Sequence, residues 1–199
     1  MTRCTWAGDD PLYIEYHDTE WGVPQTDDLV LFEKLILEGF QAGLSWITIL
    51  RKRPHFRKAF DGFQPEKIAR YTPVKQAALM ADAGIVRNKL KIEATIDNAK
   101  AYLKLAETRS LSHMIWDIAG GKPQQNSYSS MVGVPAETPV SKAISKALKA
   151  EGFRFVGPTT VYAFMQSMGM VNDHFTGCPQ YAVCAGHAKK FKMPKAKIS

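Results

Sequence analysis

The sequence predicts an all-α protein, because helix signals recur along its whole length and strand signals do not. Residues 27 to about 41 carry Leu31 and Leu35 at helical spacing behind Asp27, which can cap a helix. Residues 85–103 place apolar side chains at steps of three, four and seven, the pattern of a long amphipathic helix. Nowhere do polar and apolar residues alternate for long enough to predict a strand.

Prolines and glycines indicate further helix ends. Ser110 opens another expected helix, which Gly120-Gly121 closes. Four prolines stand where a first helical turn could begin, two of them after a threonine whose hydroxyl can cap the helix: Pro54, Pro65, Thr72-Pro73 and Thr138-Pro139.

Two expected helices meet at a short glycine-containing connection near residues 151–160. Gly152 ends the first helix, and Gly157 begins the second, followed by Pro158, Thr159 and Thr160. Such a turn can present free N–H groups at a helix N-terminus to a phosphate. A plain helical hairpin is the commoner arrangement. The basic residues nearby favour phosphate binding: Lys142, Lys146, Lys149 and Arg154.

Length and charge restrict the class of protein. The 199 residues suffice for one domain or two closely packed lobes. No apolar run could span a bilayer, and Asp9 and Asp10 stand where a signal peptide would need apolar residues, so we expect an intracellular protein without membrane partners. The formal charge is +7, but removal of the five lysines after residue 188 would take it down to +2. We therefore expect residues 187–199 to form a basic, disordered tail with weak attraction to polyanions.

A second basic cluster follows an apolar segment at residues 51–58. It contains six basic or titratable side chains: Arg51, Lys52, Arg53, His55, Arg57 and Lys58. Clusters of this kind are as often solvated helix surface as phosphate contacts, so the sequence alone leaves both interpretations open.

Glu38 stands at an unexpected place for a surface residue. It lies seven after Leu31 and three after Leu35, on the stripe that should face the core. A buried carboxylate is costly unless it has partners, and such groups are enriched in functional sites, although the stripe could also drift towards water near its end. Tryptophan and tyrosine are dense around it in the first quarter of the chain, which suits a flat ligand such as a nucleobase as well as an ordinary core: Trp6, Tyr13, Tyr16, Trp21 and Trp46.

The cysteines and histidines suggest a metal site at the two ends of the chain. An odd number of cysteines, three, does not make a disulfide framework. Cys4 and His17 near the start, with His174 and Cys178 near the end, would make a closed tetrahedral zinc set. Cys184 and His187 form a rival pair, and spacing alone does not choose between the pairs.

Several long strings of residues resemble bacterial 3-methyladenine DNA glycosylase I. The similarity extends over nearly the whole chain as far as Cys178. It is carried by Cys4-Thr5-Trp6, residues 11–14, Tyr16-His17-Asp18, residues 20–24, Leu37-Glu38-Gly39, residues 41–47, Asp82-Ala83-Gly84-Ile85 with Arg87, residues 153–157 and residues 171–174.

The resemblance implies a helix-hairpin-helix fold with a zinc site that ties the two terminal segments together. Residues 1–186 would form a single helical unit of two packed lobes, with the tail after it. The hairpin would bind DNA through Arg154, Gly157, Thr159 and Thr160. The resemblance favours Cys4, His17, His174 and Cys178 as ligands of a structural zinc over Cys184 and His187.

The resemblance also implies a base pocket and a reaction. Glu38 and Tyr16 would hydrogen-bond the base and Trp46 would stack on it, with Trp6, Tyr13 and Trp21 in the wall. Glu38 would serve as the catalytic carboxylate. Asp173 lies close to where related hairpin glycosylases carry a catalytic aspartate, but its neighbour His174 is needed for zinc, so we do not expect it to be the catalytic acid.

The implied activity is the release of free 3-methyladenine from alkylated double-stranded DNA, which leaves an abasic site. We expect a cytoplasmic bacterial monomer. The pocket motifs contain no lysine to attack the sugar, so strand cleavage is not expected. Two rivals are a zinc-stabilised module that binds DNA without catalysis, and a hairpin glycosylase for oxidised or mismatched bases.

Overall fold

A computed structural model describes residues 2–196, and these residues form a mostly helical protein. Two short 3-10 helices, η1 (Thr5–Ala7) and η2 (Asp61–Phe63), accompany the α-helices. The described α-helices are α1 (Pro11–Thr19), α2 (Asp28–Gln41), α3 (Trp46–Ala59), α4 (Pro65–Ile68), α5 (Pro73–Ala81), α6 (Lys89–Ala106), α7 (Leu111–Ile118), α8 (Pro139–Ala150), α9 (Pro158–Ser167) and α10 (Pro179–Lys190).

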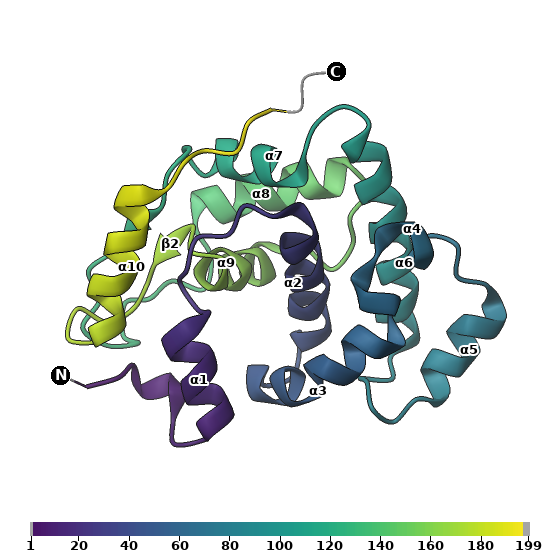
Figure 1. Ribbon diagram of the computed structural model, residues 1–199, viewed down its shortest axis with the longest axis horizontal. Helices are drawn as coiled ribbons and strands as arrows, with labels where there is room; N and C mark the ends of the chain where they lie inside the picture. The colour runs from purple at the N-terminus through teal and green to yellow at the C-terminus, as the bar shows by residue number, and fades with distance from the viewer. Residues whose placement is uncertain (1, 197–199) are drawn as a thin grey trace.

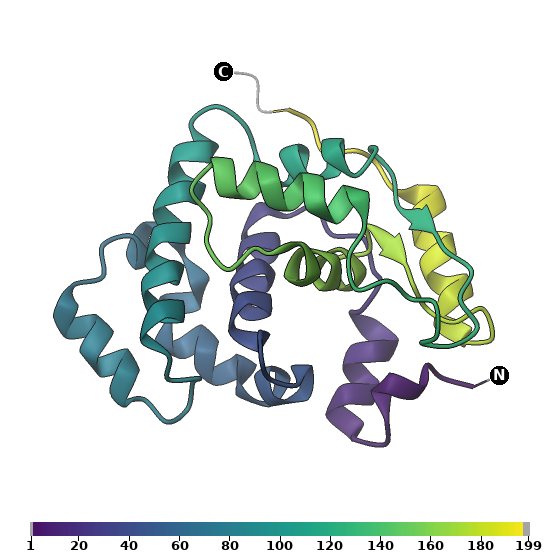
Figure 2. The ribbon, with the colours of Figure 1, turned by 180° about the vertical axis from the view of Figure 1, so that it is seen from behind.

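Helix α2 stands at the centre of the molecule (Figure 1). It packs against α3 and α6 on one side and against α7 and α9 on the other. Helices α1 and α10 lie together at one end, although they come from opposite ends of the chain, and α3 to α6 lie at the other end (Figures 1 and 2). The central helix therefore joins two groups of helices.

The sequence explains why α2 takes this place. The Asp27 side chain accepts hydrogen bonds from the backbone N–H groups of Leu29 and Val30 at 2.9 and 3.0 Å, which caps the helix as expected. Leu31 and Phe32 are fully buried in one continuous apolar core. Burial of such side chains stabilises the fold by about 1.5–3 kcal/mol each.

The structure corrects two expected helix boundaries. The helix expected over 85–103 begins at Lys89, because the Asn88 side chain caps it and residues 82–88 form turns instead. Pro54 lies inside α3 rather than at a helix start. The helix continues past this proline because Phe56, two residues on, packs against Phe40 with ring centroids 4.8 Å apart.

The expectation of no strand is also corrected, on a small scale. Residues Gln124–Gln125 (β1) pair in parallel with Val171–Asn172 (β2). Two residues are too few to show an alternating pattern, so the sequence could not reveal them. The pairing brings the loop after α7 alongside the segment that follows α9.

The expectation of a disordered tail from residue 187 is wrong for the described residues. Helix α10 continues through residues 187–190, and Phe191 then packs on Trp116 with ring centroids 4.2 Å apart. The His113 ring lies 2.9 Å from the Pro194 carbonyl oxygen. Phe191 and Pro194 are therefore held against α7, while residues 197–199 of the expected tail lie outside the described residues.

No described helix combines the length and the apolar character needed to cross a membrane.

Candidate active site and metal centre

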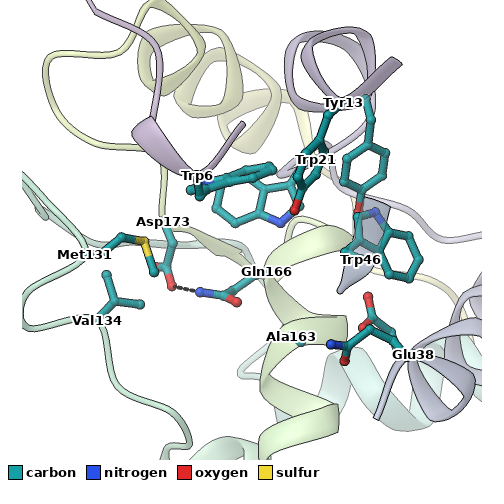
Figure 3. Close-up of a pocket in the computed structure, with 12 residues that line it drawn as sticks. Trp6, Tyr13, Trp21, Glu38, Trp46, Met131, Val134, Ala163, Gln166 and Asp173 are labelled. Carbon is teal, nitrogen blue, oxygen red and sulfur yellow. Dashed lines mark hydrogen bonds between the residues drawn. The ribbon is translucent and has the colours of Figure 1, made fainter. Parts of the chain in front are cut away.

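A cavity of about 200 Å³ opens between α1, α2 and α9 (Figure 3). Its walls are formed by the aromatic residues that the sequence analysis named as pocket candidates. Its floor carries the carboxylate of Glu38. The lining residues are Trp6, Tyr13, Tyr16, Trp21, Glu38, Gln41, Trp46, Met131, Val134, Ala163, Gln166 and Asp173.

Three short segments at the start of the chain supply four of the five aromatic rings, and α3 supplies the fifth. Trp6 comes from η1, Tyr13 and Tyr16 from α1, and Trp21 from the turn that follows. The Trp6 ring lies 5.1 Å from the Tyr13 ring and 4.9 Å from the Trp21 ring, in tilted contacts. The ring centroids of Tyr16 and Trp46, the first residue of α3, lie 5.5 Å apart. Tilted packing of this kind holds the rings rigidly, which leaves a preformed slot for a flat ligand.

The expectation that Glu38 faces inward is confirmed by its burial. The residue is 4% exposed, and its carboxylate points into the pocket beneath Trp46 (Figure 3). Burial raises the pKa of Glu38 above its usual value, and the nearby Lys34 opposes that rise. The chain thus keeps a carboxylate in an apolar place, which requires a compensating partner.

That partner is a lysine which the sequence did not reveal as part of the pocket. Lys34 lies one helical turn before Glu38, is 5% exposed, and places Nζ 3.4 Å from Glu38 Oε1. Nζ also donates to the Tyr16 hydroxyl oxygen at 2.6 Å and stands 3.5 Å from the centre of the Trp46 ring. Lys34 touches three pocket residues from behind and does not line the cavity itself.

Asp173 lines the same cavity from the opposite side, but its oxygens are occupied. It is 2% exposed and accepts hydrogen bonds from the Tyr162 hydroxyl at 2.6 Å, from Gln166 at 2.8 Å and from Asn126 at 2.6 Å. Gln166 lines the pocket, and its bond to Asp173 is drawn in Figure 3. This arrangement suits a carboxylate that positions its neighbours.

One polar group in the pocket lacks a partner. The indole N–H of Trp46 is buried and has no hydrogen-bond acceptor within the described part of the chain. A buried donor without an acceptor costs about 1–3 kcal/mol, so a ligand or water that accepts this bond would be favoured.

The four metal ligands expected from the ends of the chain come together beside the pocket. Cys4, His17, His174 and Cys178 are all buried, and one ligand atom from each lies within 4.8 Å of the others. Cys4 Sγ lies 3.6 Å from His174 Nδ1, and Cys178 Sγ lies 3.7 Å from His17 Nε2. Ligands at ordinary zinc distances on a tetrahedron would be about 3.6 Å apart from sulfur to nitrogen.

The surroundings of the two histidines fit metal binding. His17 Nδ1 lies 2.6 Å from Asp18 Oδ1, and His174 Nε2 lies 3.0 Å from the Trp21 carbonyl oxygen. Each ring is thereby oriented by the nitrogen that is not needed for a metal. Burial lowers the pKa of His174 to about 4, so this imidazole is neutral, as a ligand must be.

The two thiols also fit metal binding, whereas the alternative pair of ligands, Cys184 and His187, does not. Burial raises the pKa of the Cys4 thiol to about 12, so a thiolate at that place needs a cation beside it. Cys184 is buried nearby, but its Sγ points to the Trp21 carbonyl oxygen, 4.0 Å away. Neither Cys184 nor His187 belongs to the group of clustered ligands. Gly22 makes room for the cluster, since a Cβ there would lie 3.0 Å from the His174 ring.

The metal cluster and the aromatic pocket share a wall. Trp6 lies 5.1 Å from the His17 ring, and Trp21 lies 4.6 Å from the His174 ring. The same residues that could hold a metal therefore support two of the pocket tryptophans.

The expected hairpin lies between α8 and α9, which pack against each other. Gly157 is the N-cap of α9 and has φ −61°, with no side-chain cap. Thr159 is exposed in the first turn, and Thr160 is half-buried there. Arg154 is exposed but forms an ion pair with Asp97 at 2.6 Å. The first turn of α9 is thus accessible, while Arg154 is already engaged.

The basic cluster at residues 51–58 is largely paired within the protein. Arg53 donates to Glu20 at 2.5 and 2.7 Å, and Arg57 donates to Glu33 at 2.9 Å. Lys52 donates to the Ala83 carbonyl oxygen. These contacts favour a structural role for much of the cluster.

The fold and the site together define a helical protein with a preformed pocket of nucleobase size. A model of the methyladenine glycosylase family matches residues 6–181. The chain belongs to this family.

Relatives and solved structures agree with this assignment. The chain is 51% identical over 179 residues to DNA-3-methyladenine glycosylase of Haemophilus influenzae, covering 89% of this chain and 97% of the relative. It is 48% identical over 182 residues to DNA-3-methyladenine glycosylase 1 of Escherichia coli, covering 91% and 97%. A crystal structure of 3-methyladenine DNA glycosylase I matches with a TM-score of 0.88 at 48% identity, covering 89% of this chain and 98% of that one. A structure from Staphylococcus aureus that describes 3-methyladenine recognition matches with a TM-score of 0.87 at 37% identity, covering 91% and 97%.

Proposed function

We propose that this protein excises 3-methyladenine from alkylated double-stranded DNA by hydrolysis of the N-glycosidic bond. The observation that carries the proposal is the buried carboxylate of Glu38 at the floor of an aromatic cavity. A protein that only held the DNA backbone would need no such cavity. The two curated relatives, at about half identity over nearly their whole length, are enzymes named for this activity.

The pocket suits the chemistry of a methylated adenine. Methylation at N3 makes the base in DNA cationic and a good leaving group, so the enzyme must chiefly extrude the nucleotide, hold the base and admit water to C1′. Trp46 offers a stacking face. Glu38 accepts a hydrogen bond from the exocyclic amino group of adenine, whereas a carbonyl at that position has no hydrogen to donate. An ionised Glu38 also stabilises positive charge that develops on the sugar.

The metal in this proposal is a structural zinc. Two thiolates and two imidazoles fill a tetrahedral zinc completely, so no coordination position is left for substrate or water. Zinc held by Cys4, His17, His174 and Cys178 would contribute free energy of folding, and the reaction would use only the side chains of the pocket.

We further propose that α8, the hairpin and α9 form a helix-hairpin-helix unit that binds the DNA backbone. The free N–H groups at the start of α9 can bind a phosphate. The space in front of Gly157 is open to such a ligand, since nothing lies within 4 Å of a Cβ placed there. Thr159 adds an exposed hydroxyl. The protein would act as a monomer in the bacterial cytoplasm.

Chromatography of the products from alkylated duplex DNA tests the proposed activity. We expect free 3-methyladenine and intact strands that carry abasic sites, because Lys34 stands behind the pocket wall and does not line the cavity. DNA binding without release of any base would favour a binding module. Release of oxidised or mismatched bases in preference to 3-methyladenine would favour a glycosylase of other specificity.

A further inference from the structure

Lys34 contacts, from behind, the three side chains that we expect to hold the base. Its Nζ atom lies 3.4 Å from Glu38 Oε1, 2.6 Å from the Tyr16 hydroxyl oxygen and 3.5 Å from the centre of the Trp46 ring. A lysine ammonium has three donors and no acceptor, so the direction of each hydrogen bond is fixed. Lysines are seldom buried without a specific partner, and the exposed fraction here is 5%.

The contact with Tyr16 decides what that hydroxyl can do. Since Nζ donates to its oxygen, the single phenolic hydrogen must point elsewhere. Tyr16 lines the cavity, so its hydroxyl can donate to an acceptor on a bound base. Without Lys34 the phenol could instead turn its hydrogen towards Glu38.

The contact with Glu38 decides the charge state of the carboxylate. Burial alone favours the protonated acid, and the ammonium of Lys34 favours the ionised form. Lys34 engages Oε1, and the Ser167 side chain on α9 also approaches the carboxylate, so Glu38 is held from two sides where it faces the cavity. The ammonium thus offsets the cost of burying the carboxylate and keeps it able to accept a hydrogen bond.

We propose that Lys34 is a positioning residue of the base pocket, which holds Glu38 ionised and turns the Tyr16 hydroxyl into a donor towards the base. This inference rests on the proposed function of the pocket. It implies that binding of free 3-methyladenine is lost when Glu38 takes up a proton.

The test is calorimetric titration of free 3-methyladenine into the whole protein between about pH 5 and pH 8. Lys34→Met keeps an unbranched side chain against Trp46 and removes the charge. We expect about tenfold weaker binding at pH 7 and an acid limit of binding that moves up by about one pH unit, since loss of the ammonium raises the pKa of Glu38. The ligand's own titration is the same for every variant and cancels.

The charged and titratable groups around Glu38 and Lys34 must stay constant in this comparison. Besides these two residues and Tyr16 they are Tyr13 on α1, which lines the same cavity as Glu38, Glu20 after α1, and Arg53 on α3. Burial lowers the pKa of Lys34 to about 8, so it is charged over most of the range, and the measurements stop at this value.

Lys91 gives a matched control. It is also a buried lysine, 8% exposed, and it donates to the Phe40 and Ala42 carbonyl oxygens at 2.8 and 2.7 Å, at the end of α2. Lys91→Met should lower Tm without moving the acid limit of binding. If Lys34→Met does not fold, Lys34→Gln replaces it, because a neutral amide still donates to Tyr16 but does not hold Glu38 ionised.

Three results would overturn the inference: a Lys34 variant with the affinity and pH profile of the wild type, an equal shift in Lys91→Met, or failure of both Lys34 variants to fold. Wild-type protein that neither binds nor releases 3-methyladenine would instead contradict the proposed function, so the two failures are distinguishable.

Discussion

The carboxylate of Glu38 makes the sharpest prediction at the scale of a single residue. Glu38→Gln keeps the shape of the side chain but removes its charge and one acceptor. A charged hydrogen bond contributes about 1.5–3 kcal/mol, so affinity for free 3-methyladenine should fall by about 10-fold to 150-fold, with a similar loss of excision. Affinity for undamaged DNA should stay nearly constant. Calorimetry with the free base decides the matter, and wild-type affinity in Glu38→Gln would exclude any contact with the base.

Trp46 should contribute by a different route. Its ring covers Lys34 on one side and lines the cavity. Trp46→Ala should cost about 1–3 kcal/mol of stacking free energy for any flat purine. The measurement compares 3-methyladenine with a purine that carries a carbonyl in place of the amine. Glu38→Gln should affect mainly the former and Trp46→Ala both; a loss confined to the amine-bearing base would contradict stacking.

Some pocket residues could be predicted from the sequence and others could not. Glu38 could be predicted because it interrupts an apolar stripe. The aromatic residues could be predicted because they are concentrated in the first quarter of the chain. Lys34 was hidden because lysine at a helical position is ordinarily solvated, and only the tertiary contact with Tyr16 buries it. Met131 and Val134 come from a loop whose path over the pocket no local pattern encodes.

At the scale of an element, the hairpin before α9 has a clean test. Aspartate is a good N-cap, and Gly157 has an ordinary φ with space for a Cβ, so Gly157→Asp should leave Tm unchanged or slightly higher. The added negative charge at the helix start should weaken binding to all duplexes alike and reduce the salt slope by about one. Binding assays over a range of salt concentrations measure both effects.

Gly157→Asn is the control for that prediction, because it supplies the same cap without the charge. Equal DNA affinity for the two variants would show that no phosphate lies near this turn. Loss of binding on neutralising Lys189, Lys190, Lys192 and Lys195, with Gly157→Asp silent, would assign DNA contact to the C-terminal segment instead.

The position of the hairpin was predictable from Gly152 and Gly157, but its anchorage was not. The Asn98 side chain both donates to the Arg154 carbonyl oxygen at 3.1 Å and accepts from the Arg154 N–H at 2.6 Å. Phe155 adopts a φ of 56°, a conformation that non-glycine residues rarely take, and lies against Gly39. Helix α6 thus fixes the hairpin across 56 residues of chain, which no local pattern could indicate.

At the scale of the whole molecule, the metal cluster should govern stability. Metal analysis of freshly purified protein should find one zinc per chain. Cys4→Ser should abolish it and lower Tm by roughly 10 °C, since several kcal/mol are lost at about 2–4 °C each for a chain of this size. Activity per folded molecule should fall much less.

Cys184→Ser is the matched control, because Cys184 is equally buried beside the cluster but is not one of its ligands. It should keep both the zinc and the Tm. Zinc lost from Cys184→Ser and kept by Cys178→Ser would reverse the assignment of ligands. The pairing of the two ends of the chain was predictable only through the family resemblance, because the spacing of the cysteines and histidines left two sets possible.

The meeting of Cys4 and His17 with His174 and Cys178 has a consequence for the protein during its synthesis on the ribosome. Domains begin to fold as the chain emerges, from the N-terminal end. The central core and the hairpin can assemble from residues up to about 171, but η1 and α1 lack their last contacts until residue 178 has left the exit tunnel. The wall that the pocket shares with the cluster, which carries Trp6 and Trp21, is therefore among the last parts of the fold to close.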